Sequence, residues 1–384
     1  MSEPNSKPTL LCVANWDSNV GYAWWLMESF WVKIHAEFST DYEVVITYPS
    51  ISILPAAIHD AQIRTTAFDF GVNKLANLAQ HLRFIKQHNV TAIYFSDRPT
   101  SHWSYLFFKL AGVKKIIVHD HTPGIRTRPT GLRKFLKSCR ARIPLLAVDA
   151  AIGATEYVKD RLINISCLPA KKCFAAPNGI PITEATQNPP LDLRAQLGVA
   201  AETLLIVSTG RANLYKGVDF ALDVFAQLVH QQKCHGFHFI YCGDGPDLEF
   251  LKTMAHSLAI GNHVTFLGRV NNIDQILNSC DIAFHPSRGE VGYSLAILEY
   301  MRAGLPVLVS SNPSVCEATQ HLKDGLIYQE GNLQDACQKM TQLLSDGQLR
   351  QSLGNQGKRA IVEKYSLAAT HKALIAALQK TLAE

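Results

Sequence analysis

Short runs of apolar and β-branched residues recur along the chain, with amphipathic stretches between them. In the first half these runs are residues 10–14, 43–48, 92–95, 115–118, 147–152 and 172–175, and in the second half residues 203–208, 237–242, 264–267, 281–284, 305–309 and 326–328. Continuous apolar runs are typical of strands buried on both faces, and helices between them connect strands that run parallel. The pattern predicts an α/β protein with two doubly wound, Rossmann-like parallel sheets.

A segment rich in proline and glycine separates the two sets of strands. Pro177, Asn178, Gly179 and Pro181 form a predicted turn, and a Pro-Pro pair follows at 189–190. We therefore place a first domain at residues 1–178 and a second at residues 179–366. Residues 367–384 have the pattern of a C-terminal helix.

The composition adds limits rather than a function. With 384 residues, 47% hydrophobic and 18% charged, the chain has room for two domains of roughly 150–200 residues. No apolar run reaches the ~20 residues that cross a bilayer, and the start lacks the core of a signal peptide, so we expect a cytoplasmic protein. The nine cysteines are scattered without a Cys-x-x-Cys pair, which predicts reduced thiols, no disulfide and no zinc site.

The stretch from His285 to Val309 has the clearest pattern of a ligand site. A loop containing Gly289 and Gly292 leaves one predicted strand and enters a helix predicted at about 294–302. The unpaired N–H groups and the dipole at a helix N-terminus favour an anion such as a diphosphate.

Two glutamates belong to this stretch. Glu299 lies in an otherwise apolar helical register, where a buried unpaired charge would be costly. Ribose hydroxyls could be its partners, and so could an arginine or a backbone amide in a purely structural role. Glu290 lies in the loop, and we expect it to be open to a ligand.

The net charge of +5 is unevenly distributed. No acidic residue occurs between His121 and Val148, and seven basic residues do: Arg126, Arg128, Arg133, Lys134, Lys137, Arg140 and Arg142. Residues 131–143 have the pattern of an amphipathic helix, which favours contact of residues 126–143 with anionic membrane lipid. A helix packed on the first sheet with a solvated basic face explains the pattern equally well. Nucleic acid is disfavoured, because aromatic residues are not interleaved with the basic ones.

Several motifs in a fixed order resemble those of retaining glycosyltransferases of family 4, which have the two-domain GT-B fold with both domains facing a cleft. The Glu290 to Glu299 stretch resembles the Glu-x7-Glu signature of that family. Three further segments of the second domain are similar to family motifs: Gly210-Arg211 with Lys216-Gly217, Gly243 to Pro246, and Phe266 to Arg269. The Pro-Asn-Gly connector at 177–179 resembles the family's domain junction.

The spacing of the two glutamates departs from the signature by one residue. Eight residues separate Glu290 from Glu299, so counting back from Glu299 puts Val291 at the first Glu position. Either the loop carries one extra residue, or Glu290 does not have the usual role. We favour the extra residue, because a loop absorbs an insertion more easily than a helix.

The resemblance implies a donor site in the second domain. Arg211 and Lys216 would hold the donor diphosphate, and Glu299 would bind the nucleotide ribose. Structural ion pairing is the alternative for the two cations. The remaining donor-site candidates are Gly210, Gly243, Arg269, Glu290, Val291, Gly292, Tyr293, Ser294 and Leu295.

The resemblance also assigns residues of the first domain. His119 and His121 follow the fourth predicted strand, and a histidine there lies close to the donor sugar in similar proteins. We favour His121 slightly, and a structural, hydrogen-bonded histidine is the alternative for each. In the family, a glycine-rich loop near the first helix faces the donor phosphates, and Gly21 is the one glycine that this chain has there. Nearby aromatic residues either pack in the core or form a platform for the acceptor: Trp16, Tyr22, Trp24 and Trp25.

The expected function follows from the family. It is transfer of a sugar, of the hexosyltransferase type and with retention, from a UDP- or GDP-sugar to a glycan, polysaccharide or lipid-linked acceptor, with no metal or other cofactor. In such proteins the C-terminal helix commonly crosses back to the first domain. A relative with epimerase or phosphorylase chemistry and a non-catalytic nucleotide-sugar binder remain alternatives. A dehydrogenase is disfavoured, because Gly-x-Gly-x-x-Gly follows neither domain's first strand.

Overall fold

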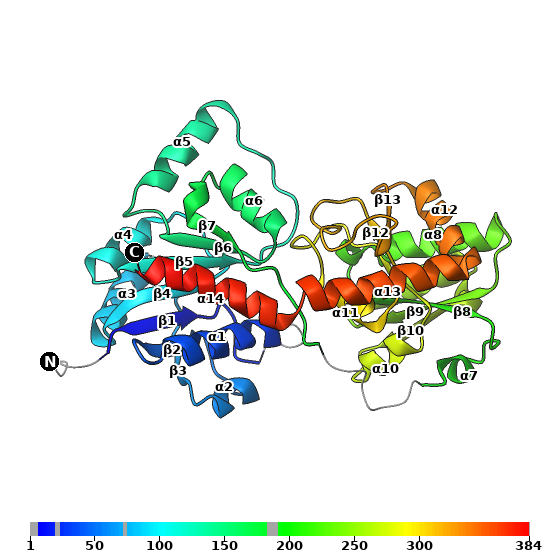
Figure 1. Cartoon of the computed structure of the whole chain (residues 1–384), viewed down its shortest axis with the longest axis horizontal. Helices are drawn as coiled ribbons and strands as arrows, with labels where there is room; N and C mark the ends of the chain where they lie inside the picture. Colours follow the sequence, from blue (N-terminus) through cyan, green and yellow to red (C-terminus); the bar gives the residue numbers. More distant parts are fainter. Residues whose placement is uncertain (1–6, 20–23, 72–74, 183–190, 384) are drawn as a thin grey trace. The chain divides into compact units, whose positions relative to one another are not determined.

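The computed structural model describes residues 7–19, 24–71, 75–182 and 191–383 (Figure 1). It divides into two compact units. The first comprises Met1–Thr122, Arg126–Pro177 and Thr370–Glu384, and the second comprises Pro123–Ile125 and Asn178–Ala369.

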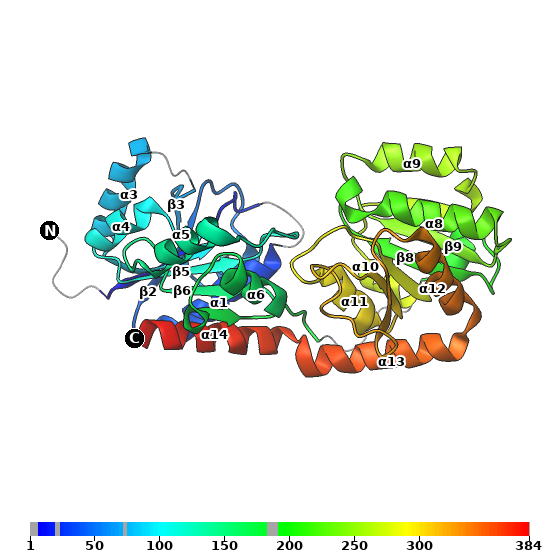
Figure 2. The ribbon, with the colours of Figure 1, turned by 90° about the horizontal axis from the view of Figure 1, so that it is seen from above.

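The first unit is built on a seven-stranded parallel sheet in the order β3-β2-β1-β4-β5-β6-β7. The strands are β1 (Thr9–Val13), β2 (Glu43–Tyr48), β3 (Arg64–Ala67), β4 (Val90–Ser96), β5 (Lys115–Asp120), β6 (Ala150–Gly153) and β7 (Cys173–Ala175). The helices are α1 (Trp25–Phe38), α2 (Ala56–Asp60), α3 (Leu75–Gln87), α4 (Trp103–Leu110), α5 (Gly131–Arg142), α6 (Glu156–Asn164) and α14 (Leu367–Ala383). Helices α1 and α14 lie on one face of the sheet, and α3 and α4 lie on the other (Figures 1 and 2).

The second unit is built on a six-stranded parallel sheet in the order β10-β9-β8-β11-β12-β13. The strands are β8 (Leu204–Thr209), β9 (Phe237–Cys242), β10 (Val264–Gly268), β11 (Ile282–His285), β12 (Val307–Ser310) and β13 (Gly325–Tyr328). The α-helices are α7 (Leu193–Leu197), α8 (Val218–His230), α9 (Leu248–Ser257), α10 (Ile273–Asn278), α11 (Leu295–Ala303), α12 (Leu333–Ser345) and α13 (Gly347–Lys364). Helices α8 and α9 cover one face, and α10, α11 and α13 cover the other (Figure 2).

The two doubly wound parallel sheets expected from the apolar runs are confirmed. One strand was missed, because β3 reads Arg-Thr-Thr-Ala and none of its residues is buried. It lies at the edge of its sheet beside β2. An edge strand needs few apolar side chains, so its sequence gives little signal.

The C-terminal helix α14 makes its contacts with the first unit from Thr370 onward. The Thr370 hydroxyl donates to the backbone oxygen of Pro177 at 2.7 Å. His371 forms a hydrogen bond with the hydroxyl of Ser29 on α1, 3.1 Å from its Nε2, and its ring contacts Phe30 edge-on. Helix α14 therefore packs beside α1 in the helical layer on one face of the first sheet.

The aromatic segment at the start of α1 divides between core and surface. Trp24 is half-buried and packs edge-on against the buried Trp31, with ring centroids 5.9 Å apart. Trp16 is exposed, and Tyr22 lies outside the described residues. Core packing therefore accounts for Trp24 but not for Trp16.

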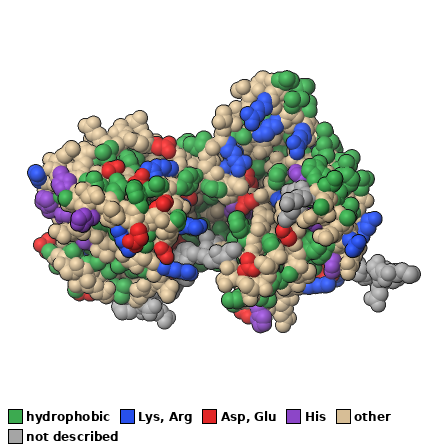
Figure 3. Space-filling model, turned by 180° about the vertical axis from the view of Figure 1, so that it is seen from behind, with side chains coloured by type: hydrophobic (Ala, Val, Ile, Leu, Met, Phe, Trp, Pro, Cys, Tyr) green, Lys and Arg blue, Asp and Glu red, His purple; other side chains and the backbone are tan. Residues whose placement is uncertain are grey.

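The exposure of the apolar side chains on α5 contradicts one of the two explanations of its amphipathic pattern. Leu132, Phe135 and Leu136 are 71%, 63% and 58% exposed, and Ala141 is the buried residue of the helix. A helix that packs on the sheet would bury these apolar side chains. Hydrophobic and basic side chains instead lie together on the surface of this part of the first unit (Figure 3).

No described helix is long and apolar enough to span a bilayer. The nine cysteines are all free thiols, and burial raises the pKa of Cys12 and Cys242, the latter to about 12. Among the described residues, no three His, Cys, Asp or Glu side chains are grouped so that they could hold a metal ion.

Candidate functional site

The carboxyl ends of β8 and β11 bring together the loops that carry the expected donor-site residues. The two strands are neighbours in the sheet although two strands separate them in the sequence. The order in which successive strands are added to the sheet reverses at this point. Open α/β sheets bind their ligands at such a point. The loop after β8 carries Arg211 and Lys216, and the loop after β11 carries Glu290.

Glu290 is the centre of a buried charge cluster. Glu290 as a residue is 8% exposed, and its carboxylate accepts hydrogen bonds from Lys216 Nζ at 2.6 Å and from His285 Nε2 at 3.1 Å. Burial by itself would raise the pKa of Glu290, but the Lys216 ammonium and His285 outweigh it and lower the pKa to about 2. The expectation of an open Glu290 was therefore wrong, because two partners engage its carboxylate.

The sequence pattern alone does not mark His285 as a site residue. It is the last residue of β11 and its side chain is buried. One sequence signal could nevertheless have identified His285: a polar residue ends a predicted strand five positions before the loop glutamate. Its role depends on a fold of the loop that returns Glu290 to the strand end.

Two glycines allow the loops to approach each other this closely. Gly217 has φ +70°, and a Cβ atom there would lie 2.0 Å from the backbone oxygen of Pro286. Gly243 has φ +155°, and its Cβ atom would lie 1.7 Å from the backbone oxygen of Gly210. Close backbone packing therefore requires glycine at these two positions of the family-like motifs.

The segment before α11 is held by the second unit itself. Ser294 caps the helix by accepting from the Ala296 N–H at 3.4 Å, and the Gly292 N–H donates to the backbone oxygen of Ser314 at 2.8 Å. The Tyr293 side chain is buried, and its hydroxyl donates to the backbone oxygen of Asn178 at 2.8 Å. Val291 and Leu295, which flank this segment, are half-buried.

Glu299 lies on α11 with no partner for its carboxylate among the described residues. The nearby Arg302 guanidinium instead donates to Asp274 at 2.6 Å and to the backbone oxygen of Pro181 at 3.1 Å. Burial raises the pKa of Glu299 to about 7, although Arg302 acts in the opposite direction. Neither an arginine nor a backbone amide in the described part of the chain therefore serves as the structural partner of Glu299.

Arg211 and Arg269 are both exposed. The side chain of neither forms a hydrogen bond or ion pair with a described residue. Arg211 follows Gly210 in the same loop as Lys216, whereas Arg269 follows the edge strand β10. Arg211 therefore shares the loop of Lys216 without joining its ion pair, and Arg269 lies two strands further along the sheet.

The two candidate histidines, His119 and His121, lie at the end of β5 in the first unit. His119 is fully buried, its Nδ1 lies 2.5 Å from the Tyr94 hydroxyl, and its ring stacks on Phe30. Burial, reinforced by the neighbouring His121, holds the pKa of His119 well below its usual range, so its ring is neutral. His119 thus has the environment of a structural histidine. His121 is half-buried and also stacks on Phe30, and Gly21 lies outside the described residues.

Two units with open parallel sheets, and a charge cluster at the switch point of the second, define a protein with the GT-B fold. The family model "Glycosyl transferases group 1" matches residues 191–360, and the model "Glycosyltransferase Family 4" matches residues 32–184. The chain belongs to the family 4 glycosyltransferases.

Three relatives illustrate the similarity. An uncharacterized glycosyltransferase of Methanocaldococcus jannaschii is 26% identical over 56% of each chain. A GDP-mannose-dependent alpha-(1-6)-phosphatidylinositol monomannoside mannosyltransferase of Mycobacterium tuberculosis is 22% identical over 84% of this chain and 79% of its own. The solved structure of Anabaena HepE in complex with UDP-glucose has a TM-score of 0.72 at 17% identity, covering 97% of this chain and 99% of that one. The chain spans about half the length of the first curated relatives it matches.

Proposed function

We propose that the protein is a retaining glycosyltransferase that moves a sugar from a nucleotide-diphosphate sugar to a glycan or lipid-linked acceptor. The second unit binds the donor and the first unit binds the acceptor. Relatives named for GDP-mannose and a similar fold solved with UDP-glucose support a donor of this class.

The observation that carries the proposal is the Glu299 carboxylate. It is half-buried on the helix that follows the loop, and no described residue forms a hydrogen bond or ion pair with it. Leaving a buried carboxylate unpaired costs stability, so such a group is retained where a ligand supplies its partners. The two hydroxyls of a ribose can both donate to one carboxylate, which fits this need.

Two cations of the loop after β8 supply the charge that the reaction requires. Arg211 and Lys216 neutralise the diphosphate as the bond between the anomeric carbon and the phosphate oxygen breaks, which leaves oxocarbenium character on the sugar. The acceptor hydroxyl then attacks from the same face, and the leaving phosphate oxygen takes its proton. Glu290, whose low pKa keeps it ionised, stabilises the positive charge that develops on the sugar.

A panel of UDP-, GDP-, ADP- and CMP-sugars tests the donor assignment by thermal unfolding. A donor present at ~100 times its dissociation constant should stabilise the protein by roughly 2.7 kcal/mol. With that donor and an acceptor extract, proton NMR of the first product should show the anomeric configuration of the donor. An inverted product would contradict retention, and a panel without any stabilising donor would contradict the donor site.

We further propose that helix α5 docks the protein peripherally on an anionic membrane surface that carries the acceptor. Leu132, Phe135 and Leu136 present an exposed apolar surface, and Arg133 and Lys134 are exposed beside it. Apolar side chains partition into the headgroup boundary, and each basic residue near an anionic surface contributes about 1 kcal/mol.

The double substitution Phe135→Ser/Leu136→Ser tests this docking. We expect at least tenfold weaker flotation with vesicles of phosphatidylglycerol and phosphatidylcholine, because the inserted apolar area is lost. The unfolding temperature should not change, since both side chains are already exposed. Phe250→Ser is the matched control, because Phe250 is 54% exposed in the second unit. Equal flotation of all three proteins would contradict the proposal.

A further inference from the structure

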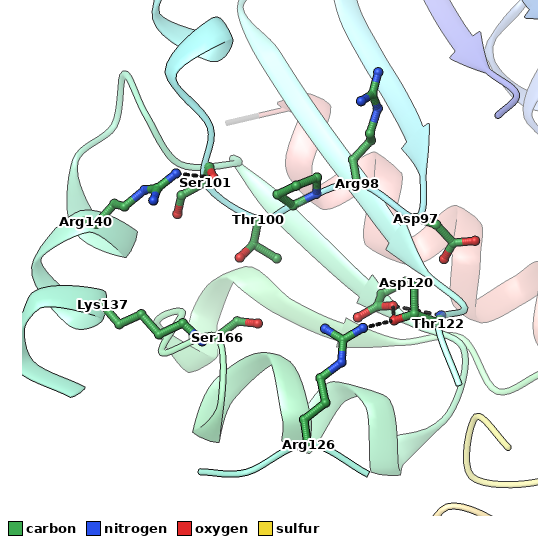
Figure 4. Close-up of a pocket in the computed structure, with 11 residues that line it drawn as sticks. Asp97, Arg98, Thr100, Ser101, Asp120, Thr122, Arg126, Lys137, Arg140 and Ser166 are labelled. Atoms are coloured by element: carbon green, nitrogen blue, oxygen red, sulfur yellow. Dashed lines mark hydrogen bonds between the residues drawn. The ribbon is translucent and has the colours of Figure 1, made fainter. Parts of the chain in front are cut away.

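A cavity of about 350 Å³ lies in the first unit at the carboxyl ends of β4 and β5 (Figure 4). Its walls come from the loop after β4, the loop after β5, helix α5 and the segment after α6. The lining residues are Asp97, Arg98, Pro99, Thr100, Ser101, Asp120, Thr122, Arg126, Lys137, Arg140 and Ser166. None of them belongs to the charge cluster around Glu290.

Three cations of the cavity are held by neutral oxygen atoms. Arg126 donates to the Thr122 hydroxyl at 2.7 Å, Lys137 to the backbone oxygen of Ile165 at 2.8 Å, and Arg140 to the backbone oxygen of Ser101 at 2.7 Å. Within the described ranges, no carboxylate forms an ion pair with any of the three. Their side chains are thus fixed in place while their positive charges remain uncompensated.

The two acids of the cavity do not supply the missing negative charge. Asp120 is paired with the buried Arg161, whose Nη2 lies 3.1 Å from each carboxylate oxygen. Asp97 accepts from the backbone N–H of His121 at 2.6 Å, and burial raises the pKa of Asp97. The cavity therefore has a net positive charge, and serine and threonine residues line it together with the cations.

We propose that this cavity binds a phosphate or diphosphate group of the acceptor. The inference rests on the proposed function only in calling the ligand an acceptor. A single carboxylate is satisfied by one bidentate arginine, whereas three cations from a loop and a helix suit a group with several charged oxygens. The position beyond the strand ends is also where open α/β sheets bind ligands.

Helix α5 links this cavity to the proposed membrane surface. Lys137 and Arg140 extend from α5 toward the cavity (Figure 4). Leu132, Phe135 and Leu136 do not line the cavity and remain exposed on the same helix. A diphosphate bound beneath α5 would leave its lipid chain near the apolar surface, which points to a lipid-linked acceptor. A soluble sugar phosphate offers the same charged group.

Calorimetric titration with inorganic pyrophosphate tests the cavity. The titration uses full-length protein carrying Arg211→Ala, which weakens the separate diphosphate site proposed in the second unit. Adding Lys137→Ala/Arg140→Ala should weaken pyrophosphate binding at least tenfold. Arg142→Ala is the matched control on the same helix, because Arg142 is exposed, bonds to the backbone oxygen of Ser138 and does not line the cavity. The control should stay within twofold of the Arg211→Ala protein.

Two results would overturn the proposal. One is unchanged pyrophosphate affinity in the protein that also carries Lys137→Ala/Arg140→Ala. The other is an equal loss in the Arg142→Ala control, which would mean that the overall basic charge of the helix attracts the anion. Circular dichroism of each variant establishes that it is folded before titration.

Two further ligands distinguish the sources of the phosphate. Farnesyl diphosphate in phosphatidylcholine vesicles represents the lipid-linked acceptor, and glucose 1-phosphate represents a soluble one. Loss of either binding in the Lys137→Ala/Arg140→Ala protein supports the cavity and identifies the source. Binding of both ligands that is insensitive to the substitutions contradicts it.

A further measurement separates this inference from the proposed function. It is the thermal stabilisation by nucleotide sugars of the Lys137→Ala/Arg140→Ala protein in which Arg211 is intact. The donor that stabilises the wild-type protein should stabilise the Lys137→Ala/Arg140→Ala protein equally, because none of the cavity residues is in the second unit. Failure of donor binding in both proteins would count against the proposed function and leave the pyrophosphate result to judge the cavity.

Discussion

Replacing Lys216 by alanine should reduce kcat/KM at least a hundredfold and also destabilise the protein. The catalytic loss is expected because, in the proposed reaction, Lys216 neutralises the departing diphosphate. The stability loss is expected because Glu290 would remain buried without its closest counter-charge, 2.6 Å away. Breaking a buried pair at one side costs roughly 3 kcal/mol. Urea unfolding and initial rates with the stabilising donor measure the two effects.

The stability loss should depend on pH with a definite sign. The folded-state pKa of Glu290 is about 2, below its usual value of 4.5. The folded state therefore favours ionised Glu290, and this stabilisation is complete above pH 4.5 and disappears as the pH falls toward 2. A difference of this size corresponds to about 3 kcal/mol. The deficit of Lys216→Ala relative to wild type should thus be full at pH 7 and shrink below pH 4.5.

Two further variants separate stability from catalysis. Lys216→Ala/Glu290→Gln removes the unpaired charge, so it should recover most of the lost stability while its activity stays low. Lys252→Ala removes a lysine from the exposed pair with Glu249, and it should change neither quantity. Full activity of Lys216→Ala would contradict a role for Lys216 in the reaction.

Replacing Glu299 by glutamine should stabilise the unliganded protein and weaken donor binding about tenfold. Burial raises the folded-state pKa of Glu299 to about 7 from 4.5. The unfolded chain therefore releases this proton at lower pH than the folded protein does, so wild-type stability falls as the pH rises from 4.5 to 7. Glutamine has no such cost, and the gain at pH 8 should be about 1 to 3 kcal/mol. The weaker binding follows because a hydrogen bond to a charged acceptor becomes one to a neutral acceptor.

The measurement is urea unfolding at pH 4 and pH 8, with donor titration at pH 8. The variant and the wild-type protein should be equally stable at pH 4, because both the folded and the unfolded chain protonate Glu299 there. Glu363→Gln on α13 is the control, since Glu363 is exposed. A Glu299→Gln protein that is less stable at pH 8 and binds the donor normally would show a structural role for this side chain.

The strands of both sheets could be predicted because most of them are buried on both faces. Predominantly apolar runs such as Phe237–Cys242 leave a signal that needs no knowledge of their neighbours. The same holds for α11, whose start at Ser294 and end at Gly304 have the residues that cap a helix. The motifs of the second unit are equally local, since each lies in one loop and owes its glycines to backbone geometry at that loop.

The contacts across loops could not be predicted in this way. Lys216 and Glu290 are 74 residues apart, and they meet because β8 and β11 are neighbours in the sheet. His285 joins them only because the loop folds back on its own strand. Tyr94 and His119 likewise meet across β4 and β5, and the buried pairing makes His119 structural. Strand order decides these contacts, and local patterns do not encode it.

The sequence by itself determined the two parallel sheets, the helix that carries Glu299 and the amphipathic character of residues 131–143. Each depends on a periodicity or on residue preferences within a short segment. Only the tertiary structure decided that Glu290 is paired, that Glu299 is not, and that α5 leaves its apolar side chains exposed while directing Lys137 and Arg140 into a cavity. These features depend on which distant segments surround a side chain, because burial and charge compensation are properties of the packed fold.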